Sequence, residues 1–273
     1  MTRSGIITLT TDFGVIDPYV AMIKGVILSV NPGATIIDIT HQVSAGSIME
    51  GATIIKDTYP YFPPGTIHIG VIDPGVGSKR RPITVIADNH FFVGPDNGLF
   101  RPVMEKQKQV DIIHLSNKKY WSNRGVSPTF HGRDLFAPVA ASLSQGTDPF
   151  LLGETIKNPT KIIFSVPTKK RGDLAGEIRR IDHFGNLITN ISKDDLRSFS
   201  GSAGIIIKTG SLTLNKVNNT YSDVPEKSPL ALIGSSDFLE IAVHMGRADN
   251  YAGHNFKTGD RVIISKEKKS LVP

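Results

Sequence analysis

The sequence predicts two domains of different fold class: an α/β N-terminal domain with a mostly parallel sheet, and an all-β C-terminal domain. Strand-like runs alternate with helix-like runs through the first 73 residues, which is the order of a parallel sheet with crossover helices. From residue 173 onward, short strand-like runs follow one another with close turn signals, which is typical of a small antiparallel barrel or sandwich. We therefore expect domains over residues 1–160 and 173–273, joined by a linker at about residues 157–172.

The N-terminal domain is expected to open with a strand and a helix. Residues 5–14, GIITLTTDFG, are rich in β-branched residues and predict a strand that ends at Asp12. Residues 17–33 predict a helix with Pro18 at its first position, ended by Pro32-Gly33. Residues three and four apart define the apolar face of this helix: Val20, Ile23, Ile27 and Val30.

A second strand, a second helix and a third strand follow. Residues 34–40 predict a buried strand, and residues 47–64 predict a helix that opens with a capping box of Ser47 and Glu50. The third strand is expected over residues 66–73, so that it ends on an aspartate. This order of elements is the basis for the parallel sheet.

The rest of the N-terminal domain is expected to hold a hairpin, a strand and a late helix. Residues 83–94 predict a hairpin that turns at Asp88-Asn89, and residues 110–116 predict a further strand. A helix is expected over residues 133–146. Because Pro138 lies inside it, we expect this helix to start late or to kink there.

The C-terminal domain is expected to consist of short strands, with few stretches long enough for a helix. The strand-like runs are residues 175–182, 186–191, 203–210, 211–217, 229–234, 238–243 and 261–266.

Composition excludes several classes of chemistry. The chain of 273 residues has no cysteine, which excludes disulfides, a cysteine nucleophile and sulfur ligands for zinc. No apolar run approaches the length of a membrane span, and the N-terminus goes into a strand pattern without the apolar region of a signal peptide. We expect a cytoplasmic location and no membrane partner.

The formal charge of +6 and the pI of about 9.4 raise the question of nucleic-acid binding. The cations, however, lie in short scattered groups that are not interleaved with aromatic residues, and no nucleic-acid-binding motif is present. We therefore expect no nucleic-acid partner.

Two aspartates stand at predicted strand ends. In an open parallel sheet, ligands bind beyond the carboxyl ends of the strands, so Asp12 and Asp73 are expected to face one crevice. An aspartate in such a place also caps helices and shapes turns. With Gly14 beside it, Asp12 suits a ribose as well, because a carboxylate accepts hydrogen bonds from both vicinal hydroxyls.

The loop that follows Asp73 is unusually rich in cations. In VIDPGVGSKRRP, residues 71–82, a proline, two glycines and three cations follow the aspartate. The loop has neither the spacing of a Walker loop nor that of G-x-G-x-x-G. Three interpretations stay open: a phosphate cradle, a solvated turn, or a polar pocket that holds a water.

The stretch FHGRD, residues 130–134, is the third candidate. His131 precedes a predicted helix and a glycine, although a single histidine is more often structural than catalytic. Four residues have oxygen or nitrogen atoms that could ligate a metal: Asp12, Asp73, His131 and Asp134. The sequence, however, has no H-E-x-x-H motif and no closely spaced cluster of ligands. A serine-hydrolase elbow, G-x-S-x-G, is also missing from the sequence.

Together, TTDFG, VIDPGVGSKRR and FHGRD, in this order and spacing, resemble the S-adenosyl-methionine hydroxide adenosyltransferase family. This is the hydrolytic branch of the group that includes the fluorinases and chlorinases. The resemblance extends to GNLITNI and SSDFLEIAV in the second half, and so covers nearly the whole chain.

The resemblance implies an N-terminal α/β domain, a C-terminal β-barrel and a homotrimer with sites at the subunit interfaces. It also implies hydrolysis of S-adenosyl-methionine to adenosine and methionine, with that molecule as the substrate and no further cofactor or metal. By motif position, the residues that handle the water are Asp73, Arg80 and His131, with Arg81 as a competitor for Arg80. Asp12 is the implied ribose ligand.

The resemblance also implies substrate contacts in the second half of the chain. Asp182, Phe184 and Asn186 of DHFGN are expected to stack on adenine and bond its edge, or to hold the methionine end. Ser235 and its neighbours are expected to reach methionine and adenine. The segment 41–52 lacks an aromatic residue that relatives carry near Gly46, and Ser236-Asp237 replaces their Phe-Gly or Arg-Gly.

Two alternatives are kept. A chlorinase-like halogenase resembles this chain but has a serine in place of Gly132, and a non-catalytic module that binds adenosine or S-adenosyl-methionine would not need Asp73, Arg80 and His131 together. If the chain is a hydrolase, our hypothesis is that Asp73 and His131 hold the water and that Arg80 stabilises its hydroxide character. A second possibility is that Asp73 orients the water and His131 takes the proton, because a neighbouring arginine makes Asp73 a poorer base.

Overall fold

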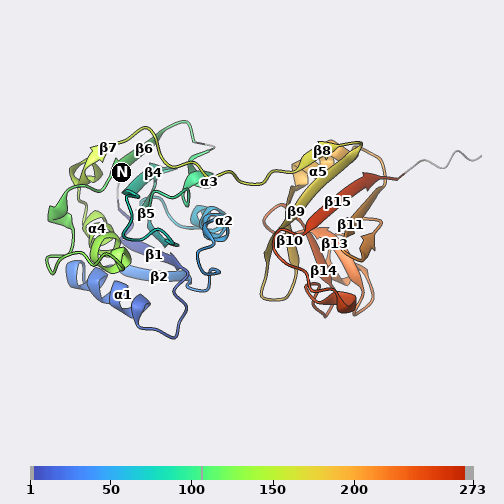
Figure 1. Ribbon diagram of the computed structural model, residues 1–273, viewed down its shortest axis with the longest axis horizontal. Coiled ribbons are helices and arrows are strands. Elements are labelled where there is room, and N and C mark those ends of the chain that lie inside the picture. The colour runs from blue at the N-terminus through green and yellow to red at the C-terminus, as the bar shows by residue number, and fades with distance from the viewer. Residues whose placement is uncertain (1–2, 106, 268–273) are drawn as a thin grey trace, which may run out of the picture. The chain divides into compact units, whose positions relative to one another are not determined.

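The computed structural model describes residues 3–105 and 107–267, and the chain divides into two compact units, residues 1–163 and 164–273. The predicted fold class is confirmed: the first unit is α/β with a largely parallel core, and the second is an antiparallel near-barrel (Figure 1). The domain limits expected from the sequence stay a prediction.

In unit 1 the elements are β1 (Ile6–Thr11), α1 (Tyr19–Val30), β2 (Thr35–Thr40), α2 (Ile48–Thr58), β3 (Ile67–Val71), β4 (Pro82–Ala87), β5 (His90–Pro95), α3 (Arg101–Met104), β6 (Val110–His114), α4 (Ala137–Ser144) and β7 (Glu154–Thr155), with 3-10 turns at Tyr59–Tyr61, Lys118–Tyr120 and Pro149–Leu152. In unit 2 they are β8 (Thr168–Lys170), β9 (Asp173–Ile181), β10 (Leu187–Ser192), α5 (Lys193–Ser200), β11 (Ile205–Thr209), β12 (Leu212–Leu214), β13 (Pro229–Ile233), β14 (Phe238–Val243) and β15 (Arg261–Lys266), with 3-10 turns at Tyr221–Asp223 and Tyr251–Gly253.

The sheet of unit 1 has the order β2-β1-β3-β5-β4-β6-β7. The pairs β1–β2, β1–β3 and β3–β5 are parallel, whereas β4 pairs antiparallel with both of its neighbours. The predicted hairpin causes this change of direction. Asp88 and Asn89 have φ values of 50° and 61°, as a tight hairpin turn between two strands requires.

Helices cover both faces of this sheet (Figure 1). On one face, Ile7 and Leu9 of β1 pack in one core with Ile23 and Ile27 of α1 and with residues of α4. On the other face, Gly70 of β3 lies against α2, because a Cβ there would be 2.8 Å from Ile55 Cδ1. The carboxyl ends of β1 and β3 therefore emerge between two helical layers.

Two sequence predictions for this unit are wrong in detail. Residues 34–40 were expected to be buried, but β2 is the edge of the sheet and its side chains are mostly exposed or half-buried. The capping box is also missing. Ser47 is the N-cap of α2 but makes no side-chain cap bond. Glu50 does not bond back to the Ser47 N–H either, and accepts instead from the Ser44 N–H at 3.0 Å.

The effect predicted for Pro138 is confirmed. A π-helical turn, Gly132–Phe136, precedes α4, and the Ala137 N–H donates to the Gly132 carbonyl five residues earlier. Pro138 thus lies at the second position of α4, directly after the π turn, and the Asp134 carbonyl four residues before it accepts instead from the Ser122 N–H at 2.8 Å. Pro18 is the N-cap of α1, one position before the place expected for it.

In unit 2 the strands follow the order β12-β11-β15-β9-β10-β14-β13, with β8 paired to β9. All of these pairs are antiparallel, and the Asn218 N–H donates to the Ala231 carbonyl of β13 at 2.7 Å. Sequence reasoning missed α5. Its signal was present, because Ser192 and Asp195 form a capping box.

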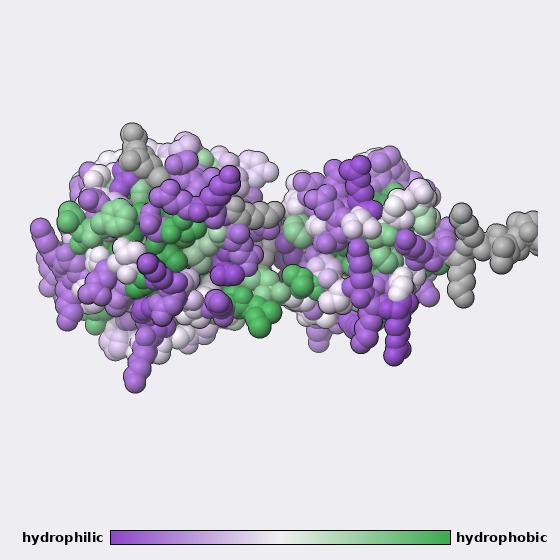
Figure 2. All heavy atoms as spheres, turned by 90° about the horizontal axis from the view of Figure 1, so that it is seen from above, coloured by the Kyte–Doolittle hydropathy of each residue, from purple (hydrophilic) through white to green (hydrophobic). Residues whose placement is uncertain are grey.

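The face of the molecule in Figure 2 is largely polar, with apolar side chains exposed on both units. Within the described ranges, no helix is long and apolar enough to cross a membrane.

A polar pair is buried on the α2 face of the sheet of unit 1. His68 Nδ1 lies 2.8 Å from Thr8 Oγ1, and His68 Nε2 lies 3.1 Å from His90 Nδ1. The Phe92 ring stacks on the His68 ring, with centroids 5.1 Å apart. Burial, aided by His90, lowers the pKa of His68 to about 3, and burial also lowers the pKa of His90.

This pair predicts that the free energy of unfolding falls in acid. The folded-state pKa of His68 is below its unfolded value of 6.5, so the unfolded chain binds more protons and stability is lost as the pH falls from about 6.5 toward 3. One such group contributes a slope of at most about 1.4 kcal/mol per pH unit.

Urea unfolding at a series of pH values would measure this slope. His68→Asn should flatten the slope, while His114→Asn, at a partly exposed histidine, should keep it; equal slopes in wild type and His68→Asn would contradict the assignment.

Candidate active site

A pocket of about 430 Å³ opens at the carboxyl ends of β1 and β3. Asp12 directly follows β1 and Asp73 follows β3 by two residues, and the two strands pair in parallel with Thr11 opposite Val71. Both aspartates therefore reach the same edge of the sheet, and both line the pocket, as the strand ends predict. The Asp12 carboxylate also accepts a hydrogen bond from the Gly46 N–H at 2.8 Å.

Three aromatic rings form one wall of the pocket. Phe13, Tyr19 and Phe130 all line it, and they contact one another edge to face with centroids 5.3 to 5.9 Å apart. Sequence reasoning did not select them as site residues. A signal was present for two of them, because Phe13 and Phe130 are the direct neighbours of Asp12 and His131.

Arg80 joins Asp73 and His131. Its Nε donates to Asp73 Oδ1 at 3.0 Å, and its Nη2 donates to Asp73 Oδ2 and to His131 Nδ1 at 2.7 Å. The side chains of Arg80 and Asp73 are only 8% and 4% exposed. Within the described residues, Nη1 of Arg80 is buried without a hydrogen-bond partner, and such a donor favours an oxygen ligand.

The contact with Arg80 fixes the protonation of His131. A guanidinium only donates hydrogen bonds, so Nδ1 of His131 is the acceptor, and in the neutral ring the proton is on Nε2. Burial lowers the pKa of His131 and the Arg80 charge lowers it further, against Asp73 and Asp134, which raise it. At neutral pH, His131 is thus an uncharged residue of the pocket lining with its proton on Nε2.

The neighbouring arginine has other partners. Arg81 donates from Nε and Nη2 to Asp96 Oδ2, at 2.9 and 2.6 Å, and its Nη2 also donates to the Asn158 carbonyl at 2.6 Å. Neither arginine is itself in the lining of the pocket. The two differ in their partners, because Arg80 bonds Asp73 and His131, which do line it, whereas Arg81 bonds Asp96 and Asn158, which do not.

Two glycines set the shape of the pocket loops. Gly77 has φ +77°, and a Cβ there would lie 2.4 Å from the Pro128 carbonyl oxygen, so the loop after Asp73 abuts the loop before His131. Gly132 is buried, and a Cβ there would be 3.1 Å from Ile23 Cδ1 and 3.4 Å from the Phe130 ring. A larger residue at 132 would press on the aromatic wall.

The remaining predicted residues lie in unit 2. Asp182 accepts hydrogen bonds from the backbone N and from Nδ2 of Asn186, both at 2.9 Å, which rigidifies the β9–β10 turn and leaves Phe184 70% exposed. Ser235 lies in the β13–β14 turn, at the other end of the β10–β14 pair. At about 3.3 Å per residue, it is on the order of 13 Å from Asn186 along the strand.

Unit 1 thus brings two carboxylates, Asp12 and Asp73, and the His131 imidazole to the lining of an aromatic-walled pocket, and the Arg80 guanidinium bonds two of these three groups. This set can bind a cationic or hydroxyl-bearing ligand and orient a water. Across residues 3–105 and 107–267, no group of three or more histidine, aspartate or glutamate side chains is arranged to hold a metal ion.

Known proteins match the chain along nearly its whole length. Residues 7–153 match the N-terminal domain, and residues 176–263 the C-terminal domain, of the SAM hydroxide adenosyltransferases. A relative from Methanocaldococcus jannaschii, an (R)-S-adenosyl-L-methionine hydrolase, is 40% identical over 255 residues, which cover 89% of this chain and 90% of that one. A fluorinase from an Actinoplanes species is 29% identical over 297 residues, covering 96% and 97%.

The fold is also that of a solved structure. An uncharacterized conserved protein from Thermotoga maritima superimposes with a TM-score of 0.87 at 33% identity, covering 95% of this chain and 99% of that one.

The contact between the two pocket loops gives a prediction for Gly77→Ala. The new Cβ would meet the Pro128 carbonyl oxygen at a left-handed backbone position, so the variant should lose more than the roughly 1–2 kcal/mol that such a conformation costs a residue with a Cβ. Gly125→Ala is the matched control, because Gly125 has φ +91° with open space around it. Urea unfolding would compare the two variants, and an equal loss would contradict a tight contact between the loops.

Proposed function

The chain belongs to the S-adenosyl-methionine hydroxide adenosyltransferase family, and from this premise we propose that it hydrolyses (R)-S-adenosyl-L-methionine to adenosine and L-methionine. Two findings support the substrate. The matching family models cover most of both units, and the relative that is 40% identical carries the name of a hydrolase of that sulfonium epimer. The observation that supports the chemistry is the contact of one buried arginine with both Asp73 and His131.

The reaction that we propose is an in-line displacement at C5′ of the ribose. An oxygen–carbon bond forms as the carbon–sulfur bond breaks, and the electron pair of that bond goes to sulfur. Methionine leaves as a neutral thioether, so no general acid is needed. The sulfonium and one water thus give adenosine, methionine and one proton. The catalyst has to hold the oxygen at attack distance, which is worth up to about 7–11 kcal/mol.

Three side chains would handle the water. The Nε2–H of His131 and the carboxylate of Asp73 orient it, and Arg80 stabilises its hydroxide character. Two contacts favour this arrangement over proton removal by His131. The acceptor nitrogen of the ring is already occupied by Arg80, and burial and the Arg80 charge lower the pKa of the ring, so it is a weak base.

The proposal extends to the other residues of the pocket. We propose that Asp12 accepts from the ribose hydroxyls and that the rings of Phe13, Tyr19 and Phe130 contact the sulfonium side, since aromatic faces attract cations. Four residues of unit 2 would bind adenine and methionine: Asp182, Phe184, Asn186 and Ser235. We also propose a homotrimer, in which subunits bring these residues to the pocket of a neighbour.

A halogenase is less well supported. The similarity to a fluorinase is lower, at 29% identity against 40% for the hydrolase, and Gly132 leaves no side chain to contribute to a halide pocket. A module that only binds the substrate would not require a buried guanidinium between Asp73 and His131.

The proposed reaction predicts the fate of isotope-labelled water. Incubation of the protein with the substrate in ¹⁸O-water should yield adenosine labelled at the 5′ oxygen, equimolar methionine and one proton per turnover, which mass spectrometry and a pH indicator measure. Asp73→Asn and His131→Ala should each lower kcat by about 10²–10⁴-fold. Substrate that stays intact with the wild-type protein would reject hydrolysis, and chloride would be the next nucleophile to add.

The two adjacent arginines provide a matched pair of variants. Arg80→Lys should lower kcat by at least about 10²-fold, because a lysine cannot donate to Asp73 and His131 in the same fork geometry. Arg81→Lys changes the neighbouring residue in the same way, but its partners are Asp96 and Asn158, and it should keep kcat within about threefold of wild type. Steady-state kinetics would decide, and a larger loss in Arg81→Lys would reverse the assignment.

A further inference from the structure

The loop of residues 122–131 builds one side of the pocket; it is irregular up to Phe130, and His131 is the N-cap of the π-helical turn that follows. It contributes Ser127, Thr129, Phe130 and His131 to the lining. Its internal bonds are short in range: the Ser127 hydroxyl lies 3.2 Å from Thr129 Oγ1 and accepts from the Thr129 N–H at 3.3 Å. Such a loop needs contacts with a rigid element if His131 is to keep one position.

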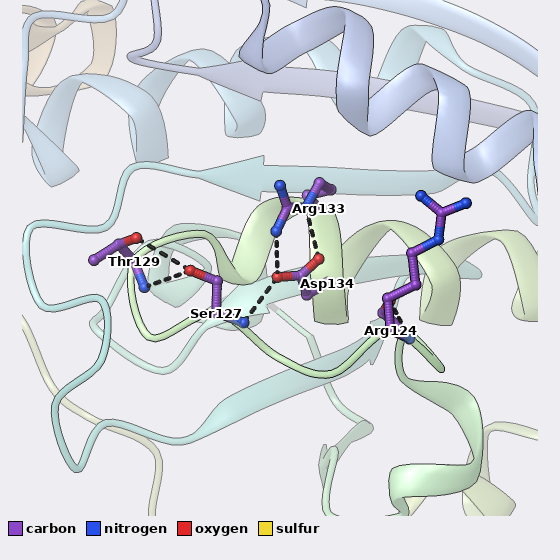
Figure 3. Close-up of polar contacts among 6 residues, drawn as sticks. Arg124, Ser127, Thr129, Arg133 and Asp134 are labelled. Atoms are coloured by element: carbon purple, nitrogen blue, oxygen red, sulfur yellow. Dashed lines mark hydrogen bonds and ion pairs between the residues drawn. The ribbon is translucent and has the colours of Figure 1, made fainter.

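Asp134, in the π-helical turn, provides those contacts (Figure 3). Its carboxylate accepts from the Ser127 N–H at 2.9 Å, and its backbone carbonyl accepts from the Ser122 N–H at 2.8 Å. The Asp134 N–H in turn donates to the Phe130 carbonyl at 3.2 Å. One residue therefore binds the start, the middle and the end of the loop.

Arg133 completes this arrangement. Its Nε and Nη2 donate to the two oxygens of Asp134, at 2.7 and 2.8 Å, as the paired dashed lines in Figure 3 show. Its guanidinium lies 5.0 Å from the centroid of the Phe130 ring, within the range of a cation–π contact. The pair thus also supports the aromatic wall of the pocket.

Asp134 is not itself placed to react. It is 4% exposed, it does not line the pocket, and both of its oxygens already accept hydrogen bonds. Burial alone would raise the pKa of Asp134, but the bonds from Arg133 and the Ser127 N–H hold it below its ordinary value. The carboxylate is therefore a permanent acceptor for the loop.

We propose that Asp134 is a positioning residue for the reaction: it holds loop 122–131, and through it His131 and Phe130, in the geometry that the displacement needs. This inference rests on the proposed function for its effect on the rate, but not for its effect on the loop. A misplacement of about 1 Å is enough to cost an enzyme on the order of 10²-fold in rate.

The chain offers a matched control in Asp96. This aspartate is also 4% exposed and also accepts from an arginine, Arg81, and from one backbone N–H, that of Thr160 at 2.7 Å. Asp96→Ala therefore removes a buried carboxylate with the same kinds of partner in the same unit. Asp134→Asn is the conservative variant, because its amide oxygen still accepts from the Ser127 N–H.

Two readouts separate positioning from general damage. The first is hydrogen exchange of peptides within residues 122–131, measured without substrate. Asp134→Ala should speed this exchange at least about tenfold, Asp134→Asn should speed it less, and Asp96→Ala should leave it at the wild-type rate.

The second readout is kinetic. Asp134→Ala should lower kcat at least about tenfold, and Asp134→Asn should lower it by an intermediate amount. The only tryptophan of the sequence, Trp121, adjoins the loop, and its emission should shift only in the Asp134 variants.

Either of two results would overturn the proposal: wild-type exchange and kcat in Asp134→Ala, or the same changes in Asp96→Ala as in Asp134→Ala. If Asp134→Ala fails to fold, Asp134→Asn against Asp96→Asn is the comparison. A failure of the proposed function is recognised separately, because wild-type protein would then release no adenosine, while exchange and Trp121 emission would still test the loop.

Discussion

The geometry of the pocket depends on one cation shared by two acceptors. Arg80 is almost fully buried, and a buried charge is tolerated only when it is paired and hydrogen-bonded. Its partners are Asp73, two residues after the end of β3, and His131, 51 residues after Arg80 in the chain. By bonding both acceptors, this guanidinium fixes the distance between the loop after β3 and the segment that leads into the π-helical turn. Gly77 makes this approach feasible, since only a residue without a Cβ fits against the Pro128 carbonyl.

The same loop contains two arginines with different partners. Arg80 turns toward Asp73, and Arg81 turns toward Asp96 and the Asn158 carbonyl, in the segment that leads out of unit 1. Adjacent residues in extended chain point to opposite sides, so a run of two cations can pair with two separate carboxylates. The charges of both arginines in this loop are therefore offset within their own pairs.

Much of this architecture could be predicted from the sequence, because local rules and tertiary structure agree. The β-branched run before Asp12, the turn at Asp88-Asn89 and the late start of the helix at Pro138 follow from backbone sterics alone. What could not be predicted depends on neighbours distant in sequence. The exposure of β2 results from its place at the sheet edge. Glu50 bonds Ser44 because the preceding loop brings that N–H within reach. To tell the partners of Arg80 from those of Arg81, one needs the positions of Asp73 and Asp96. Of the aromatic wall, Tyr19 could not be recognised, because its contact with Phe130 joins residues 111 positions apart in the printed chain.

The π-helical turn before α4 has a consequence for how this region tolerates change in length. A π turn contains one residue more per hydrogen-bonded ring than an α turn. Deleting a single residue between Asp134 and Pro138 would allow regular α-helix, and each residue before the deletion would rotate by about 100° around the axis. His131 would then leave Arg80, and Asp134 would leave the Ser127 N–H. Insertions and deletions, which loops usually accept, are therefore constrained in this turn as strictly as the identity of its residues.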